Sequence, residues 1–183
     1  MKRGEICKEI EVKRKGQVWI ETVIYLLIAF VMIGLVLSFI RPKIEEVRDK
    51  AIIEQSLELM KDVENLMLIE IGSPGNKRLI ELNIKKGSLI IDGKEDRVLF
   101  EIESRYVYSE PGQEVQVGNI VALTEVKGEY NLVTLERDFS DSYNLTYKNE
   151  DILKTLSKAS IPYKLYITNN GELNNKITMN FDL

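Results

Sequence analysis

The stretch RKGQVWIETVIYLLIAFVMIGLVLSFIRPK, from Arg14 to Lys43, contains 19 consecutive uncharged residues, 22–40. Within residues 18–40 the one charged side chain is Glu21. As an α-helix this segment would be about 34 Å long, enough to cross a hydrocarbon core of roughly 30 Å. Because only a helix satisfies the backbone of a single segment there, the sequence predicts a membrane-spanning helix over residues 18–40. The alternative is a buried helix of a soluble protein, but such helices rarely run this far without a polar face.

The composition of the 183-residue chain argues against several kinds of chemistry. There is no histidine and one cysteine, Cys7, so Cys/His metal sites, imidazole catalysis and an internal disulfide framework are not expected. The formal net charge is −4, but residues 1–16 hold six basic and three acidic residues, a net of +3. The rest of the chain therefore has 19 basic and 26 acidic residues, a net of −7. Nucleic acid is not an expected partner of such a surface.

The charges that flank the apolar segment predict its orientation. Lys13, Arg14 and Lys15 precede it, whereas basic and acidic residues are mixed over 41–50 on the other side. The positive-inside rule then places the N-terminus in the cytoplasm and the C-terminal domain outside the cell. We expect a single-pass protein of the cell membrane.

A candidate processing site lies before the apolar segment and not after it. An ordinary secretory signal ends in a small-residue cleavage site, but Arg-Pro-Lys follows Ile40. The processing-like feature is Lys15-Gly16-Gln17. Cleavage after Gly16 would remove a basic leader, residues 1–16, and leave the apolar helix at the new N-terminus.

The residues around this site resemble the class III signal peptide of archaeal type IV pilin-like proteins, a group that includes pilins and archaellins. The family pattern is a short basic leader, a glycine before the cut, a polar or small residue after it, and a glutamate at the fifth mature position. Arg14-Lys15-Gly16 matches the leader and its glycine. Gln17 follows the cut, and Glu21 is the fifth mature residue. The resemblance covers residues 13–70 and implies cleavage by a prepilin peptidase and polymerisation with like or related pilin subunits.

Glu21 has two interpretations. A carboxylate at membrane depth is costly and tends to mark function. In the family, the resemblance implies, this glutamate seats a new subunit against the N-terminal amine of a neighbouring subunit. Opposite charges attract strongly in a low dielectric, so such a pair would set the axial register. The alternative is that Glu21 lies at the level of the lipid headgroups, where the helix dipole favours it.

Beyond the apolar segment the sequence continues as an amphipathic stem. Residues 43–71 lack glycine and proline, and apolar residues recur at helical spacing: Ile44, Val47 and Ala51, then Leu59, Val63, Leu66 and Met67. We expect one helix over residues 17–71, kinked near Pro42 and ended by Gly72-Ser73-Pro74-Gly75. One face of the stem is expected to pack on a globular headgroup. An exposed coiled-coil stalk is the alternative, for which the heptads are too irregular.

After Asn76 the apolar residues alternate along the chain. The alternating runs are Ile80, Leu82 and Ile84; Val98, Phe100 and Ile102; Tyr163, Leu165 and Ile167; and Ile177, Met179 and Phe181. Turn signals lie between them at Lys86-Gly87, Asp92-Gly93, Glu110-Pro111-Gly112, Lys127-Gly128 and Asn170-Gly171. The predicted fold class is α+β, a long N-terminal helix followed by an antiparallel β-sheet or β-sandwich headgroup over 76–183. A short helix is expected over residues 151–159.

The headgroup sequence shows no pattern typical of catalysis or metal binding. Asp138, Asp141 and Asp151 fail the spacing of a calcium loop and are better explained as a solvated acidic loop. No nucleophile motif or phosphate loop occurs, so we expect no enzymatic activity, no metal and no cofactor. Asn144-Leu145-Thr146 is the single N-glycosylation sequon, which makes Asn144 a candidate for a glycan on an outward-facing loop.

Two functions are consistent with these features. The first is a structural subunit, major or minor, of an archaeal type IV pilus-like surface filament, assembled through its N-terminal helix. The second is a monomeric, membrane-anchored extracellular binding domain. The basic leader and Glu21 favour the first, because a plain anchor needs neither.

Overall fold

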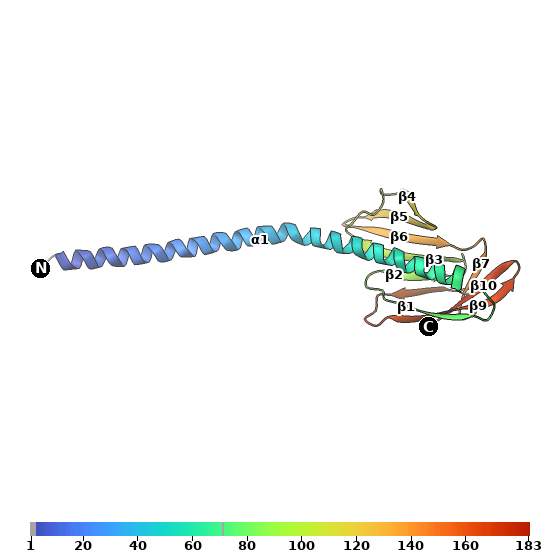
Figure 1. Ribbon diagram of the computed structural model, residues 1–183. Helices are drawn as coiled ribbons and strands as arrows, with labels where there is room; N and C mark the ends of the chain where they lie inside the picture. The colour runs from blue at the N-terminus through green and yellow to red at the C-terminus, as the bar shows by residue number, and fades with distance from the viewer. Residues whose placement is uncertain (1–2, 71) are drawn as a thin grey trace. The chain divides into compact units, whose positions relative to one another are not determined.

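One long helix and a set of strands make up the protein. A computed structural model describes residues 3–70 and 72–183, with side chains for 19–68 and 72–183. Helix α1 (Arg3–Asn65) is followed by a short π-helix (Leu66–Glu70) and the strands (Figure 1). The strands are β1 (Lys77–Leu82), β2 (Ser88–Asp92), β3 (Arg97–Ser104), β4 (Glu114–Val117), β5 (Ile120–Lys127), β6 (Tyr130–Asp138), β7 (Tyr143–Tyr147), β8 (Leu153–Ser157), β9 (Tyr163–Leu173) and β10 (Lys176–Asp182).

Helix α1 belongs to two compact units, residues 1–44 and Glu45–Leu183. It passes Pro42 without a break in the helix, and the predicted kink there stays a prediction. The glycine- and proline-containing stretch after residue 71 separates the helical part from β1, as expected. The predicted long helix is therefore confirmed, and its stem, residues 45–65, is part of the second unit.

The strands of the second unit form two sheets. The four-stranded sheet has the order β1-β9-β10-β7, and the six-stranded sheet has the order β4-β5-β6-β3-β2-β8. Neighbouring strands are antiparallel except β7 and β10, which pair in parallel and make the smaller sheet mixed. These sheets confirm the predicted α+β class, a long helix followed by a β-rich head.

The stem of α1 and both sheets share one hydrophobic core. The stem contributes side chains spaced three or four residues apart, namely Ile53, Leu57, Met60 and Val63, and Met67 of the π-helix continues this spacing. The six-stranded sheet contributes Phe100, Ile102 and Leu135 among others, and the four-stranded sheet contributes Leu165, Ile167 and Phe181. Each such side chain stabilises the fold by roughly 1.5–3 kcal/mol through burial. The stem is thus packed on the head and is not a free coiled-coil stalk.

Two buried carboxylates of the stem fix its position on the six-stranded sheet. Asp49 is 5% exposed, accepts a hydrogen bond from the backbone N–H of Arg105 at 2.8 Å, and pairs with the ammonium group of Lys86. Glu64 is 7% exposed and accepts bonds from Arg137 Nε and from the side-chain amide of Asn119, both at 2.8 Å. A buried charge without a partner is costly, so these contacts specify one register of helix on sheet.

The predicted helix over residues 151–159 is wrong, because this segment contains strand β8. β8 pairs antiparallel with β2 and forms an edge of the six-stranded sheet. Lys154 takes the inward position beside Leu156 and places its ammonium group 5.2 Å from the centre of the Tyr147 ring. A lysine at an inward position hides the alternation that would otherwise indicate a strand.

The turn predicted at Asn170-Gly171 is also displaced. Both residues lie inside β9, opposite Thr178 of β10, where the register shifts by one residue. Gly171 has a φ of 93° and accommodates this bulge. The chain reverses at Asn174 and Asn175, whose φ values of 52° and 66° are typical of a type I′ turn. Asparagine tolerates positive φ well enough to form this turn without glycine.

Candidate membrane-spanning and assembly segment

The apolar part of α1 has exposed side chains throughout residues 19–40. An 18-residue window of the helix has a mean hydropathy of 2.9, and none of it is buried. Trp19 and Phe39, near its two ends, are both 76% exposed. The protein therefore has one helix that is long and apolar enough to span a membrane, within the described residues.

The apolar side chains of the two parts of α1 differ in their exposure to solvent. Large apolar residues between Trp19 and Ile40 are 41–76% exposed, whereas Ile53, Met60 and Val63 are at most 2% exposed. Leaving a large side chain in water forgoes roughly 1.5–3 kcal/mol relative to burying it. The exposed apolar side chains of residues 19–40 therefore suit an apolar environment, either lipid or the helices of other subunits.

Glu21 lies near the start of this uncovered segment. Its side chain is exposed, and no ion pair joins it to any side chain among residues 19–68, the helical side chains that the structure describes. Glu21 lies four residues, or about 6 Å of helix rise, after Gln17. One helical turn thus separates the carboxylate from the amine that cleavage after Gly16 would create.

The predicted processing residues fall where the structure gives the backbone alone. Lys15, Gly16 and Gln17 are within α1, but their side chains lie outside the described residues. Cleavage after Gly16 therefore stays a prediction.

Asn144, the predicted glycosylation residue, is in strand β7 and not in a loop. Its side chain is half-buried and lines an open hollow of about 350 Å³. The other lining residues come from the segment after β7 and from the β9–β10 hairpin, namely Asp151, Leu173, Asn174, Lys176 and Thr178.

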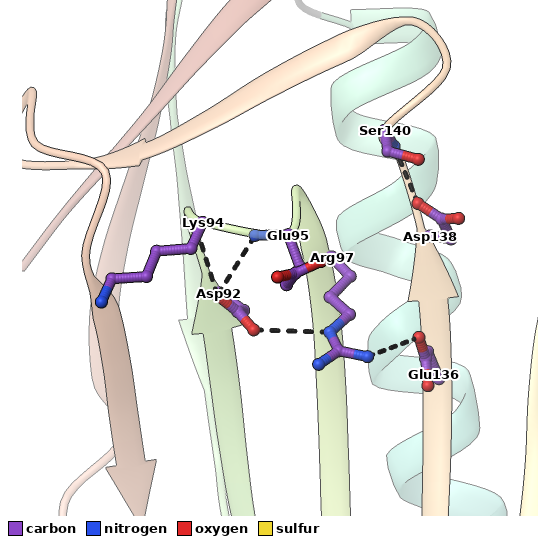
Figure 2. Close-up of polar contacts among 7 residues, drawn as sticks. All are labelled: Asp92, Lys94, Glu95, Arg97, Glu136, Asp138 and Ser140. Atoms are coloured by element: carbon purple, nitrogen blue, oxygen red, sulfur yellow. Dashed lines mark hydrogen bonds and ion pairs between the residues drawn. The ribbon is translucent and has the colours of Figure 1, made fainter.

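A polar cluster ties strands β2, β3 and β6 together at one end of the six-stranded sheet. Figure 2 shows Arg97 between Asp92 and Glu136, which accept its hydrogen bonds at 3.4 Å and 3.2 Å. Partial burial lowers the pKa of Arg97, but the hydrogen bonds and charges of Glu136 and Asp92 outweigh it, so that the pKa lies above its ordinary value. Asp92 also accepts bonds from the backbone N–H groups of Lys94 and Glu95, which closes the β2–β3 turn. The cluster therefore has a structural role: it holds the β2–β3 turn and joins it to β6.

The three aspartates of the predicted acidic loop are not gathered into one site. Asp138 accepts a bond from the backbone N–H of Ser140 at 2.8 Å, which is the main reason that its pKa lies below the ordinary value (Figure 2). Asp141 and Asp151 line different hollows. Among the described residues, no group of three His, Cys, Asp or Glu side chains could hold a metal ion.

A hollow of about 290 Å³ beside the stem brings together charged side chains. Two ion pairs lie at its wall, Glu45 with Arg105 at 2.8 Å and Asp49 with Lys86, and Arg48 and Glu103 line it as well. These pairs explain the hollow as part of the contact between stem and sheet.

Asp49 and Glu64 are the important residues that the sequence interpretation missed. Charged residues of an amphipathic helix are ordinarily assigned to the solvent face, but Asp49 lies four residues before Ile53 and Glu64 lies four residues after Met60. Their spacing relative to the buried apolar residues is the signal that could have found them.

Comparison of the chain with protein-family models, with curated proteins and with solved structures finds no match.

Proposed function

We propose that the protein is a structural subunit of an archaeal type IV pilus-like surface filament. A prepilin peptidase cleaves it after Gly16, and the mature subunit assembles through the apolar part of α1. The β-rich head, residues 76–183, lies outside the cell. Before assembly the subunit is held in the cell membrane by the same helix.

The observation that supports this function best is the uncovered apolar helix that begins beside a carboxylate. A monomeric anchor does not need Glu21, because a charge near an apolar span opposes insertion. In a bundle of such helices, the carboxylate of one subunit pairs with the N-terminal amine of another. The pair sits in a low dielectric, where the attraction is strong, and it fixes how far one subunit slides along the next.

The packed stem gives a second argument for a subunit of a filament. A head joined to its helix through a buried core and two buried carboxylates keeps a fixed orientation on the stem. Regular assembly requires such rigidity, whereas a tethered binding domain works as well on a flexible linker.

The processing step is tested by the N-terminal residue of the protein isolated from its native membrane. We expect mass spectrometry to find a chain that begins at Gln17 and lacks Cys7. Gly16→Phe should block cleavage, because the peptidase must approach the backbone closely at this residue. Detection of the full-length chain alone would contradict the assignment of a leader.

The assembly step is tested by Glu21→Gln, with Glu58→Gln as the matched control. Both changes remove one carboxylate from an exposed position of α1, but Glu58 lies in the stem, outside the apolar segment. We expect Glu21→Gln to leave insertion, cleavage and head folding unchanged and to lower the ratio of subunit in sheared filaments to subunit in the membrane. Glu58→Gln should leave that ratio unchanged. If no filament contains the wild-type protein, the monomeric anchored binding domain is the better assignment.

A further inference from the structure

The hollow beside β7 is lined by polar side chains that the rest of the head leaves unpaired. Its volume of about 350 Å³ lies at the lower end of the range for small-molecule sites. Four of its lining side chains are polar groups that form no hydrogen bond or ion pair within residues 72–183, namely Asn144, Asp151, Asn174 and Thr178. Their hydrogen-bonding groups are therefore available to a ligand.

The hydroxyl of Thr178 is the most informative of these groups. Its oxygen Oγ1 is buried and has no hydrogen-bond partner among residues 72–183. Such a group is costly, because it has lost its hydrogen bonds to water and has gained none from the protein. Nearly all buried polar groups in native proteins are paired, so this exception needs an explanation. Thr178 lines the hollow, and a ligand bound there can supply the missing hydrogen bond.

The charges of the lining argue against an anion and against a metal ion. Asp151 is the acidic residue of the lining, and the basic residue, Lys176, is paired with Asp96 at 3.3 Å. The uncompensated charge at the wall is therefore negative, which repels an anion. A metal ion would find one carboxylate beside an ammonium group, whereas hard cations take several oxygen ligands. These charges favour a neutral ligand.

The uncharged part of the lining matches a sugar ring. The amides of Asn144 and Asn174 offer donors and acceptors, and the carboxylate of Asp151 offers acceptors. Sugar hydroxyls both donate and accept, so they can pair with all three side chains. Leu173 is 65% exposed at the hollow and provides an apolar surface for the C–H face of a ring. A linear polyol has the hydroxyls but presents no such face.

The two sides of the hollow are held together by the buried carboxylate of Asp96. This carboxylate accepts a hydrogen bond from the backbone N–H of Leu145 in β7 at 2.9 Å. It also pairs with Lys176 of β10, so one side chain joins β7 to the β9–β10 hairpin. A site whose walls are already fixed loses less conformational freedom when it binds a ligand.

We propose that this hollow is a binding site for a single neutral sugar ring. The ring pairs with the polar side chains of the wall, and one of its hydroxyls reaches Oγ1 of Thr178. The site lies within the unit Glu45–Leu183. It goes beyond the proposed function, because it depends neither on cleavage after Gly16 nor on assembly.

Binding is tested by saturation-transfer NMR on the full-length protein in a detergent without a sugar headgroup. The probes are the methyl glycosides of glucose, galactose and mannose, with sorbitol as a linear polyol and methyl β-glucuronide as an anion. We expect at least one neutral glycoside to bind with a Kd of about 1–10 mM. Sorbitol and the glucuronide should bind several-fold more weakly. The absence of a signal from all three neutral glycosides overturns the proposal, and so does equal binding of sorbitol or of the glucuronide.

Two conservative variants locate the binding at the hollow. Thr178→Val keeps the shape of the side chain and removes the hydroxyl, and Asp151→Asn keeps the size and removes the charge. We expect each to weaken binding of the glycoside by roughly threefold to tenfold, the worth of one hydrogen bond. Asp141→Asn is the matched control and should leave the Kd unchanged, because Asp141 is an exposed aspartate at a different hollow. Equal binding by the wild type and both hollow variants overturns the assignment of the site.

Thermal unfolding separates a ligand-binding role of Thr178 from a structural role. Because its hydroxyl has no partner among residues 72–183, Thr178→Val should leave Tm unchanged or raise it while it weakens glycoside binding. A lower Tm in this variant would show that the hydroxyl stabilises the fold, and it would overturn the assignment of Thr178 as a ligand-binding group.

Discussion

Replacing Ile53 with alanine tests whether the stem of α1 belongs to the core of the unit Glu45–Leu183. The Ile53 side chain is 0% exposed and lies among apolar residues of both sheets. Truncating such a side chain removes buried methyl groups and leaves a cavity, which costs about 2–5 kcal/mol of unfolding free energy. Val47 lies on the same helix but is 69% exposed, so Val47→Ala should change the free energy by no more than about 0.5 kcal/mol.

The assay is urea unfolding of a fragment of residues 45–183, followed by circular dichroism. With a slope of roughly 1–3 kcal/mol per molar urea, a loss of about 3 kcal/mol moves the midpoint down by about 1–3 M. The slope itself should stay the same in both variants, because a change in slope would report a different denatured or native state. If the two substitutions lower the midpoint equally little, the stem is a free stalk and the packing argument is refuted.

Three further outcomes follow from the contacts of the head. Glu64→Ala leaves the guanidinium of Arg137 partly buried without its carboxylate, so we expect a loss of about 3–5 kcal/mol in the same unfolding assay, far more than for an exposed glutamate. The pKa of Asp138 is lowered in the folded state, so its contribution to stability is complete above the unfolded pKa of about 3.9 and is lost as the pH falls through the lower, folded pKa. In Asp138→Asn the unfolding free energy should therefore decrease less steeply as the pH falls below about 4. The same pH dependence in the variant and the wild type would contradict this assignment. Gly87 has a φ of 83°, and a Cβ there would collide with a backbone carbonyl of the neighbouring strand. Gly87→Ala should therefore lower the unfolding free energy by more than about 1–2 kcal/mol. Gly72→Ala is the control and should be well tolerated in the same assay, because a Cβ at Gly72 meets nothing within 4 Å.

The sequence predicted the elements whose physical signal is local. The apolar length of residues 18–40 and the helical spacing of the stem were sufficient for α1. The alternation of apolar residues was sufficient for β3 and for the β9–β10 pair, in which Ile167 lies opposite Phe181 as the pattern requires. In these segments the periodicity and the final burial agree, so nothing in the tertiary structure overrides it.

The failures occurred where a distant residue decides the outcome. Lys154 faces inward in β8 because the ring of Tyr147 receives its ammonium group, and no local pattern reveals that partner. The parallel pairing of β7 with β10 joins residues that are 34 positions apart, such as Tyr143 and Ile177, and no periodic pattern in the sequence indicates it. The same holds for Asp96, whose carboxylate accepts a bond from the backbone of Leu145.

The candidate site was predictable to a different extent. The sequence indicated Glu21 and Asn144 as residues of interest, but it did not predict how exposed their side chains are. Whether the apolar helix would be covered by the head, and whether the sequon would lie in a loop or a strand, depends on how the whole chain packs. Asn144 was expected in an outward-facing loop and is in strand β7.

The way the stem enters the core has a mechanical consequence. A force applied along the stem reaches the head through several parallel attachments, the buried side chains from Ile53 to Met67 and the ion pairs of Asp49 and Glu64. Because these contacts are arranged along the direction of pull, they must shear together and cannot open one after another. The load is therefore distributed over more than four helical turns of the stem. The head resists detachment from the stem as a unit.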